Sequence, residues 1–182
     1  TKSQVNNTIP VDVTATYSSP VSPPPYMAGM VEIELDKETG SIEILDYQAV
    51  IDCGIPVNPN LARVQAEGGI GQGIGMALYE NVTYDADGRI AENSLMQYKI
   101  PTREDIRNVH VEFETSYEPT GPFGVKSIGE IVINTPAPAL AHAIYRATGV
   151  WHRTVPFTPE KILMRMIDPQ WQENDRRVQT AE

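Results

Sequence analysis

Five glycines within one helical pattern, between Pro59 and Tyr79, constrain the fold more than any other feature of the sequence. Asn58 and Pro59 suit the N-cap and first residue of a helix. Each interior glycine destabilises a helix by about 1 kcal/mol relative to alanine. The helix must therefore gain stability from a close approach to its backbone. The glycines are Gly68, Gly69, Gly71, Gly73 and Gly75.

The strongest strand signal is a period-2 alternation before this helix. Residues 30–36 place Val31, Ile33 and Leu35 on one face, and residues 41–51 follow after a turn that contains Gly40. Together they predict a β-hairpin. Further strands are expected at 80–84, 89–91 and 109–114, with a surface loop over 93–105.

Two more helices are expected near the C-terminus. Pro136 can begin one that ends at Gly149, and Thr158 can cap another that runs to about Ile167. Because hairpins interleave with helices without regular βαβ alternation, the predicted class is α+β, an antiparallel β-sheet packed with helices.

The chain is expected to form one domain flanked by two extensions. Residues 1–27 are polar and then proline-rich, which predicts an extended arm. Residues 28–167 would form the domain, and residues 168–182 a polar tail.

Composition limits the classes of partner. A net charge of −10 disfavours nucleic acid and anionic membranes, and no apolar run reaches the length of a membrane span. The single cysteine, Cys53, excludes an internal disulfide, a cysteine zinc site and an iron–sulfur cluster within this chain. We expect a soluble, cytoplasmic protein.

The stretch Gly121–Glu130 is the place where the sequence suggests chemistry, because a glycine-punctuated loop there delivers a carboxylate. Val125 stands where a phosphate-binding P-loop needs glycine before lysine, which excludes that motif. Glu130 is a candidate base in a protected pocket, or else a surface acid or a partner of Lys126 or an arginine.

Gln65 and Gln72 lie seven residues apart and so near one face of the glycine-rich helix. If buried, each amide needs partners at both ends, which a polar heterocycle could supply. The alternative is that the helix face serves packing alone.

Several stretches, taken in order, resemble the C-terminal part of the molybdenum-binding subunit of the xanthine dehydrogenase/aldehyde oxidase family, the molybdenum hydroxylases. The resemblance is collinear from about residue 28 to residue 166. The stretches that carry it are Val31–Gly40, Asp52–Pro59, Gln65–Gly75, Gly121–Glu130, Ala147–Gly149 and Pro156–Pro159.

The resemblance implies a role for individual residues. Glu130 matches the family's catalytic glutamate, a base that acts on a water-derived oxygen at molybdenum. Gln72 matches a residue that hydrogen-bonds the molybdopterin cofactor, and no side chain here need ligate the metal. The cofactor loop would comprise Lys126, Ser127, Ile128 and Gly129, where Ser127 departs from the glycine or alanine common in the family.

The resemblance also implies missing parts, because the family's molybdenum subunit is several times longer. We expect the rest of that subunit, an iron–sulfur module and an FAD module as partners, and an isolated chain without activity. The expected reaction is hydroxylation of a purine such as xanthine or hypoxanthine with water-derived oxygen. Aldehydes, N-heterocyclic acids such as nicotinate, and a non-catalytic scaffold remain alternatives.

Overall fold

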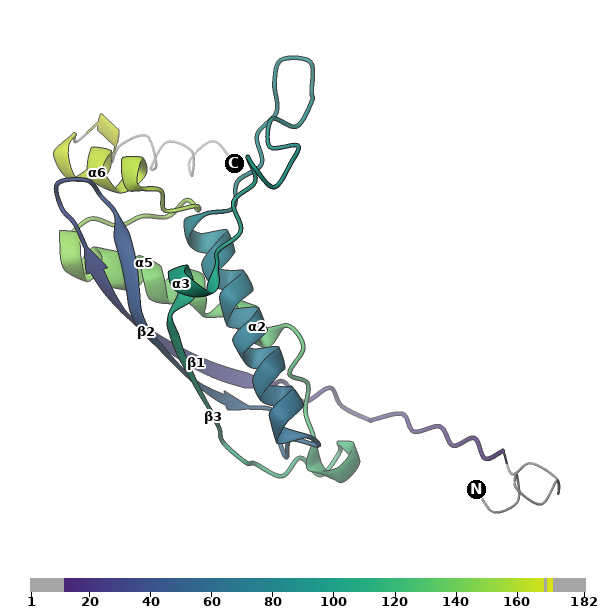
Figure 1. The fold of residues 1–182 in the computed structure, drawn as a ribbon. Coiled ribbons are helices and arrows are strands. Elements are labelled where there is room, and N and C mark those ends of the chain that lie inside the picture. Colours follow the sequence, from purple (N-terminus) through teal and green to yellow (C-terminus); the bar gives the residue numbers. More distant parts are fainter. Residues whose placement is uncertain (1–11, 169, 172–182) are drawn as a thin grey trace.

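The computed structural model describes residues 12–168, 170 and 171. A three-stranded sheet forms one layer and helices form the other (Figure 1). Residues 12–25 form no helix or strand and are mostly exposed. The first eleven residues of the expected arm and most of the expected tail over 168–182 lie outside the described residues.

Strands β1 (Tyr26–Leu35) and β2 (Ile42–Asp52) form the predicted antiparallel hairpin. Gly40 adopts φ +76° in the turn, as a left-handed position requires. The first strand begins at Tyr26, earlier than the alternation indicated, because Tyr26 pairs with Asp52 at the far end of the hairpin.

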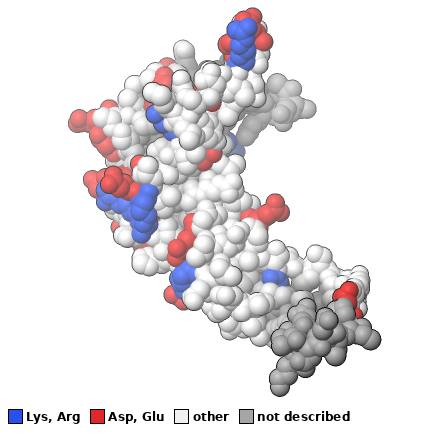
Figure 2. All heavy atoms as spheres, turned by 45° about the vertical axis from the view of Figure 1, so that its right-hand side comes forward, with Lys and Arg blue, Asp and Glu red and all other residues white. Residues whose placement is uncertain are grey.

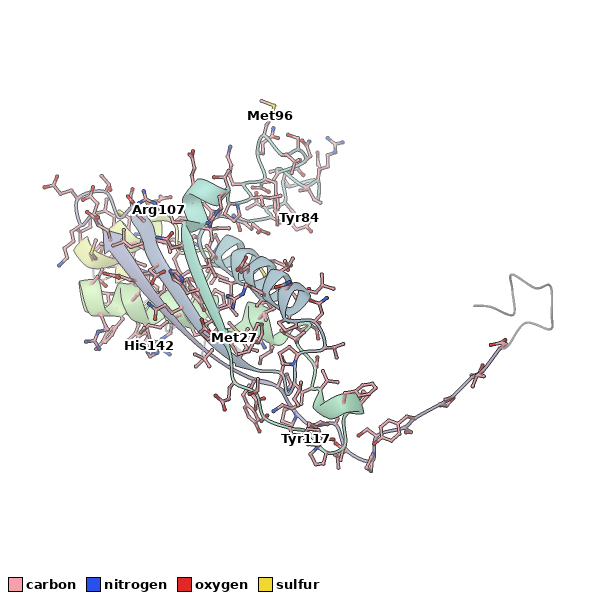
Figure 3. All side chains as sticks on the ribbon, turned by 60° about the horizontal axis from the view of Figure 1, so that its bottom comes forward. Met27, Tyr84, Met96, Arg107, Tyr117 and His142 are labelled. Atoms are coloured by element: carbon pink, nitrogen blue, oxygen red, sulfur yellow. The ribbon has the colours of Figure 1, made fainter. Side chains whose placement is uncertain are left out.

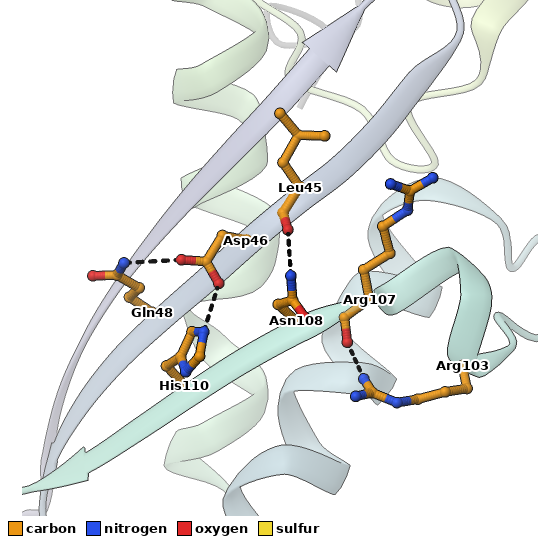
Figure 4. Close-up of polar contacts among 7 residues, drawn as sticks. All are labelled: Leu45, Asp46, Gln48, Arg103, Arg107, Asn108 and His110. Atoms are coloured by element: carbon orange, nitrogen blue, oxygen red, sulfur yellow. Dashed lines mark hydrogen bonds and ion pairs between the residues drawn. The ribbon is translucent and has the colours of Figure 1, made fainter.

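Strand β3 (Asn108–Phe113) completes the order β1-β2-β3 and lies parallel to β2. The α+β class is confirmed, whereas the expectation of antiparallel pairing is wrong for this strand. The reason is the helical crossover between β2 and β3, which returns the chain to its starting end. The Asn108 amide also donates to the Leu45 carbonyl oxygen at 3.3 Å (Figure 4).

Helix α2 (Pro59–Leu78) begins as predicted, with the Asn58 side chain accepting from the Asn60 and Leu61 amides. Its glycines make room for the short helix α4 (Ile131–Asn134) and for α5 (Pro136–Thr148). A Cβ on Gly69 would clash with Val132, and one on Gly73 would lie 2.7 Å from Pro136 Cγ. The predicted close approach to the helix backbone is confirmed.

The C-terminal helices also end and begin where the sequence indicates. Gly149 caps α5 with φ +75°, and Thr158 accepts from the Lys161 amide at the start of α6 (Pro159–Ile167). The core lies between the helices and one face of the sheet. Its largest fully buried apolar side chains are Ile44, Tyr47, Ile51, Ile70, Ile74, Leu140, Ile144 and Ile162.

We call residues 79–102 the projection. Tyr79 at its base packs against the core, whereas Tyr84 and Met96 lie in the part that extends away from the body of the domain (Figure 3). The two strands expected at 80–84 and 89–91 are wrong, since only an isolated bridge joins Tyr84 and Ile90. Within the described part of the chain no third strand pairs with these two segments, and a lone hairpin is marginal in water. The one-turn helix α3 (Arg103–Ile106) follows, where a loop was expected to continue.

Charged side chains form small separate groups on the face shown in Figure 2, with broad uncharged areas between them. That face carries no extended basic stripe of the kind that follows a nucleic-acid backbone. Among the helices of the described residues, none has both the length and the hydropathy needed to cross a membrane.

Candidate functional site

The candidate site is built on the irregular chain that follows β3. This segment includes the short 3-10 helix η1 (Pro122–Gly124) and then returns to the end of β2 through an isolated bridge between Gly54 and Val125. The Ile55 amide donates to the Gly124 carbonyl oxygen at 2.9 Å. Gly54 adopts φ +69°, and a Cβ there would clash with that carbonyl. The loop is therefore joined directly to the sheet.

Lys126 joins the loop to the sheet through both its backbone and its side chain. Its amide donates to the Cys53 carbonyl oxygen at 2.7 Å, and its ammonium lies 2.5 Å from Asp52 Oδ2 and over the Tyr26 ring. Only 7% of the Lys126 side chain and 21% of the Asp52 side chain are exposed. The Lys126 side chain thus faces the sheet and leaves only backbone to face a ligand.

Asp52 is held ionised by the same contacts. Burial alone would raise its pKa, but hydrogen bonds from Lys126, from the Ser116 hydroxyl and from the Gly54 amide, with the Lys126 charge, lower the pKa to about 2. Ser116 Oγ lies 2.6 Å from Asp52 Oδ1 and the Gly54 amide 3.0 Å from it. Both carboxylate oxygens are therefore occupied.

Glu130 lines a hollow of about 320 Å³ between α2 and the start of α4, which we call the glutamate hollow. Gln65, Gln72 and Gly129 also line it, and Gln65 Nε2 donates to the Gly129 carbonyl oxygen at 2.8 Å. Both glutamines and Glu130 are exposed. The condition of burial is therefore not met for either glutamine, although both line one hollow.

A second hollow of about 530 Å³, which we call the apolar hollow, adjoins the first and shares Gln65 and Gly129 with it. Lys126 and Ile128 line it with Cys53. Burial raises the pKa of the Cys53 thiol, which keeps it protonated near neutral pH.

Ser127 lies in a different environment. It lines a hollow of about 690 Å³ together with Lys126, residues 120–122, and Tyr17 and residues 19–23 of the arm. The structure thus gathers Gln72, Gly129 and Glu130 in one hollow and Lys126, Ile128 and Gly129 in the next, and it directs Ser127 toward the arm.

Two residues around these hollows were missed as site residues by the sequence reasoning. Gly68 lines the glutamate hollow, and a Cβ added there would meet nothing within 4 Å, unlike the other glycines of α2. Asp52 belongs to a stretch that carried the resemblance, yet it was given no role. A helix glycine without a packing reason is detectable only when the helix's neighbours are known.

The lining fits a polar planar ligand. Gly68 and Gly129 both face open space, so the backbone on either side of the glutamate hollow is accessible to close approach. The Gln72 amide offers a donor and an acceptor. Glu130 is the charged side chain among the residues that line this hollow. Over residues 12–168, 170 and 171, no three His, Cys, Asp or Glu side chains gather as a metal site.

The fold is an α+β domain in which one helix, α2, and the loop before α4 together line two adjoining hollows. Residues 2–107 match the molybdopterin cofactor-binding domain family. The chain belongs to the xanthine dehydrogenase family of molybdopterin-binding oxidoreductases. The resemblance seen in the sequence is confirmed, and with it the molybdopterin-type cofactor.

Individual relatives agree. The chain is 42% identical over 151 residues to "Probable hypoxanthine oxidase" of Escherichia coli (strain K12), covering 82% of this chain and 16% of that protein. It is 40% identical over 144 residues to the gamma subunit of the 6-hydroxypseudooxynicotine dehydrogenase complex of Paenarthrobacter nicotinovorans, covering 78% of this chain and 18% of the relative.

A solved structure shows the same architecture. Quinoline 2-oxidoreductase from Pseudomonas putida 86 superposes with a TM-score of 0.71 at 33% identity, covering 76% of this chain and 18% of that chain. The chain therefore spans less than a fifth of the length of these relatives. Two of the relatives are named as subunits of such enzymes.

Proposed function

We propose that this chain supplies the glutamate-bearing part of the active site of a molybdenum hydroxylase, with Glu130 as the catalytic base. The observation that carries the proposal is the meeting of Glu130, Gln72 and Gly129 around one hollow. These residues come from α2 and from a loop more than fifty positions later in the chain. A surface acid without a function would have no need to share a hollow with Gln72 and Gly129.

Each residue has a defined task in this proposal. The Gln72 amide would hydrogen-bond the cofactor, and the backbone of Lys126, Ser127, Ile128 and Gly129 would help to hold it. The open space beside Gly68 and Gly129 allows that approach. The cofactor supplies the redox chemistry and the activated water-derived oxygen when it is bound.

In this proposal Glu130 is the general base, and its carboxylate would accept a proton from the water-derived oxygen. Its carboxylate must be ionised, and it must lie within hydrogen-bond reach of the group that it deprotonates. Glu130 is exposed in this chain, whereas a general base works best where water is excluded. The remaining part of the molybdenum subunit would cover it, and iron–sulfur and FAD modules would carry the electrons away.

We infer a purine such as hypoxanthine or xanthine as the substrate class, from the relative that is 42% identical and named as a hypoxanthine oxidase. N-heterocycles form the second candidate, because other relatives are named for 6-hydroxypseudooxynicotine and nicotine. A panel of hypoxanthine, nicotinate and an aromatic aldehyde separates these classes by their kcat/KM values.

The decisive experiment replaces Glu130 with glutamine in the assembled enzyme that contains this chain. Glutamine keeps the size of the side chain and removes the base, so we expect hydroxylation to fall by at least about a hundredfold while bound molybdenum stays unchanged. Glu67→Gln on the exposed face of α2 is the matched control.

Two results would contradict the proposal. Turnover by the Glu130→Gln enzyme within a few fold of wild type would remove Glu130 from catalysis. An assembled wild-type complex that retains no molybdenum would favour the non-catalytic scaffold.

A further inference from the structure

The loop that carries Glu130 is attached to the domain at two points. At its start, Lys126 is bound to the end of β2 through its backbone and its side chain. At its end, the Gly129 carbonyl oxygen accepts a hydrogen bond from Gln65 of α2. Only Ser127 and Ile128 lie between these attachments, and Glu130 follows the second one directly.

The short span gives the loop little freedom. A residue of extended chain covers at most about 3.6 Å, so two residues between fixed points leave few alternative paths. The backbone that faces the cofactor and the Cα atom of Glu130 are then placed by the attachments. A loop of this sequence without them would sample many positions, since Gly129 restricts the backbone only weakly.

We propose that Asp52 and Gln65 are positioning residues for the reaction, because they fix the two ends of loop 126–129 and thereby the place of Glu130. The proposal rests on the proposed function, in which Glu130 is the base. Neither Asp52 nor Gln65 needs to touch the substrate or the reacting atoms.

Asp52 is suited to this role because other groups hold it in place. It is the last residue of β2 and pairs in register with Tyr26 of β1. One of its oxygens accepts from Ser116 and from the Gly54 amide, which leaves the other for Lys126. A carboxylate held by two groups besides Lys126 moves less than a free surface carboxylate. Asp52 therefore fixes the start of the loop relative to the sheet.

Gln65 provides the independent second anchor. It projects from α2, whose inner face is buried by the core, and it is itself exposed. Its replacement by alanine removes one hydrogen bond and leaves the core intact. A loss of activity in this variant could not be attributed to unfolding.

The chain offers a matched control for the acid. Asp46 lies on the same strand, where Gln48 Nε2 donates to its Oδ2 at 2.9 Å and His110 Nε2 lies 3.2 Å from its Oδ1 (Figure 4). Asp46 is six residues from Asp52, or about 20 Å along an extended strand. Asp46→Asn therefore removes the same charge from the same strand away from the loop.

The test compares Asp52→Asn, Gln65→Ala and Asp46→Asn in the assembled enzyme, with retained molybdenum measured for each. Misplacement of a base by about 1 Å can lower a rate about a hundredfold. We expect kcat to fall about tenfold to a hundredfold for Asp52→Asn and at least about threefold for Gln65→Ala. KM should change less than about threefold, and Asp46→Asn should match wild type.

A second readout does not depend on catalysis. Amide hydrogen exchange reports the hydrogen bond from the Lys126 amide to the Cys53 carbonyl oxygen. We expect exchange at Lys126 to accelerate at least about tenfold in Asp52→Asn and to be unchanged in Asp46→Asn.

The outcomes separate this inference from the proposed function. If Glu130→Gln abolishes turnover while Asp52→Asn and Gln65→Ala keep kcat within twofold of wild type, the positioning role is wrong. It is also wrong if activity falls only in proportion to lost molybdenum, or if Lys126 exchange is unaltered. If Glu130→Gln leaves turnover intact, the proposed function fails, and the exchange experiment still decides whether Asp52 holds the loop.

Discussion

The loop before Glu130 and the projection over residues 79–102 are both irregular, yet they are attached to the domain in different ways. The loop makes backbone hydrogen bonds to Ile55 and to Cys53 at the end of β2, and its Lys126 side chain is largely buried. The projection bonds mainly within itself, through Thr83 with Glu92 and through Asp85 with Arg89.

The two regions also differ in how much of their side chains is exposed. The projection exposes large apolar side chains, among them Leu95 at 76% and Met96 at 83%. The loop exposes Phe123 but buries Gly124 and directs Lys126 inward. Irregular chain can hold a functional group in place when long-range contacts restrict it, and sequence irregularity alone does not show which case applies.

The most severe test of this contrast removes the buried cation from the loop. Lys126→Met leaves Asp52 charged without its partner, and breaking a largely buried ion pair destabilises a protein by about 3 kcal/mol. Chemical denaturation should show this loss in the free energy of unfolding. The control is Lys99→Met in the projection, where Nζ donates to the exposed Met96 carbonyl oxygen and the effect should stay below about 0.5 kcal/mol. Equal effects would abolish the distinction.

The second-largest effect is expected from acid, which should weaken the ion pair between Asp52 and Lys126. The pKa of Asp52 is lowered from 3.8 to about 2, so its stabilising contribution is complete above the unfolded value and is lost as pH falls toward 2. We expect the stability difference between wild type and Asp52→Asn to shrink by about 2 kcal/mol between about pH 5 and pH 2. A difference independent of pH would show that Asp52 is not held ionised by the fold.

A substitution at Gly69 tests the close packing of α2 on α4, the helix that follows Glu130. Gly69→Ala would place a methyl group against Val132 of α4, directly after the loop. Overpacking should exceed the gain in helix propensity and lower the free energy of unfolding by about 1 to 2 kcal/mol, measured by thermal and chemical denaturation. A variant as stable as wild type would mean that α4 can shift freely, contrary to a fixed Glu130.

At Gly68, one residue earlier, the same substitution should stabilise the chain instead of destabilising it. Gly68→Ala meets open space, so helix propensity should raise the free energy of unfolding by up to about 1 kcal/mol. The methyl group would enter the glutamate hollow, and retained molybdopterin should fall in the assembled enzyme. A variant that is more stable and keeps its full cofactor content would show that the cofactor does not approach Gly68.

The smallest effect is expected in the projection. Replacing Leu95 and Met96 together with serine should change the free energy of unfolding by less than about 0.5 kcal/mol, since both side chains are exposed. The measurement is denaturation of the chain by urea. A loss above about 1 kcal/mol would show that the projection packs on the domain in solution.

The sequence predicted the elements whose signals are local. The alternation of residues 30–51 indicated the hairpin, and Asn58, Thr158 and Gly149 marked helix ends through contacts within a few residues. The glycines of α2 indicated a close neighbour without identifying it. The turn signal at residues 85–88 was real, but the strands predicted on either side of it had no third strand to pair with.

The sequence by itself thus determined the hairpin, the three longer helices α2, α5 and α6, and a loop that ends in a carboxylate, because these depend on residues near each other in the chain. The tertiary structure alone decided that β3 runs parallel, that Gln72 and Glu130 share a hollow, and that Asp52 and Gln65 hold the loop. Each of these pairs residues 58 to 74 positions apart, or strands joined by a long crossover, so no local pattern encodes it.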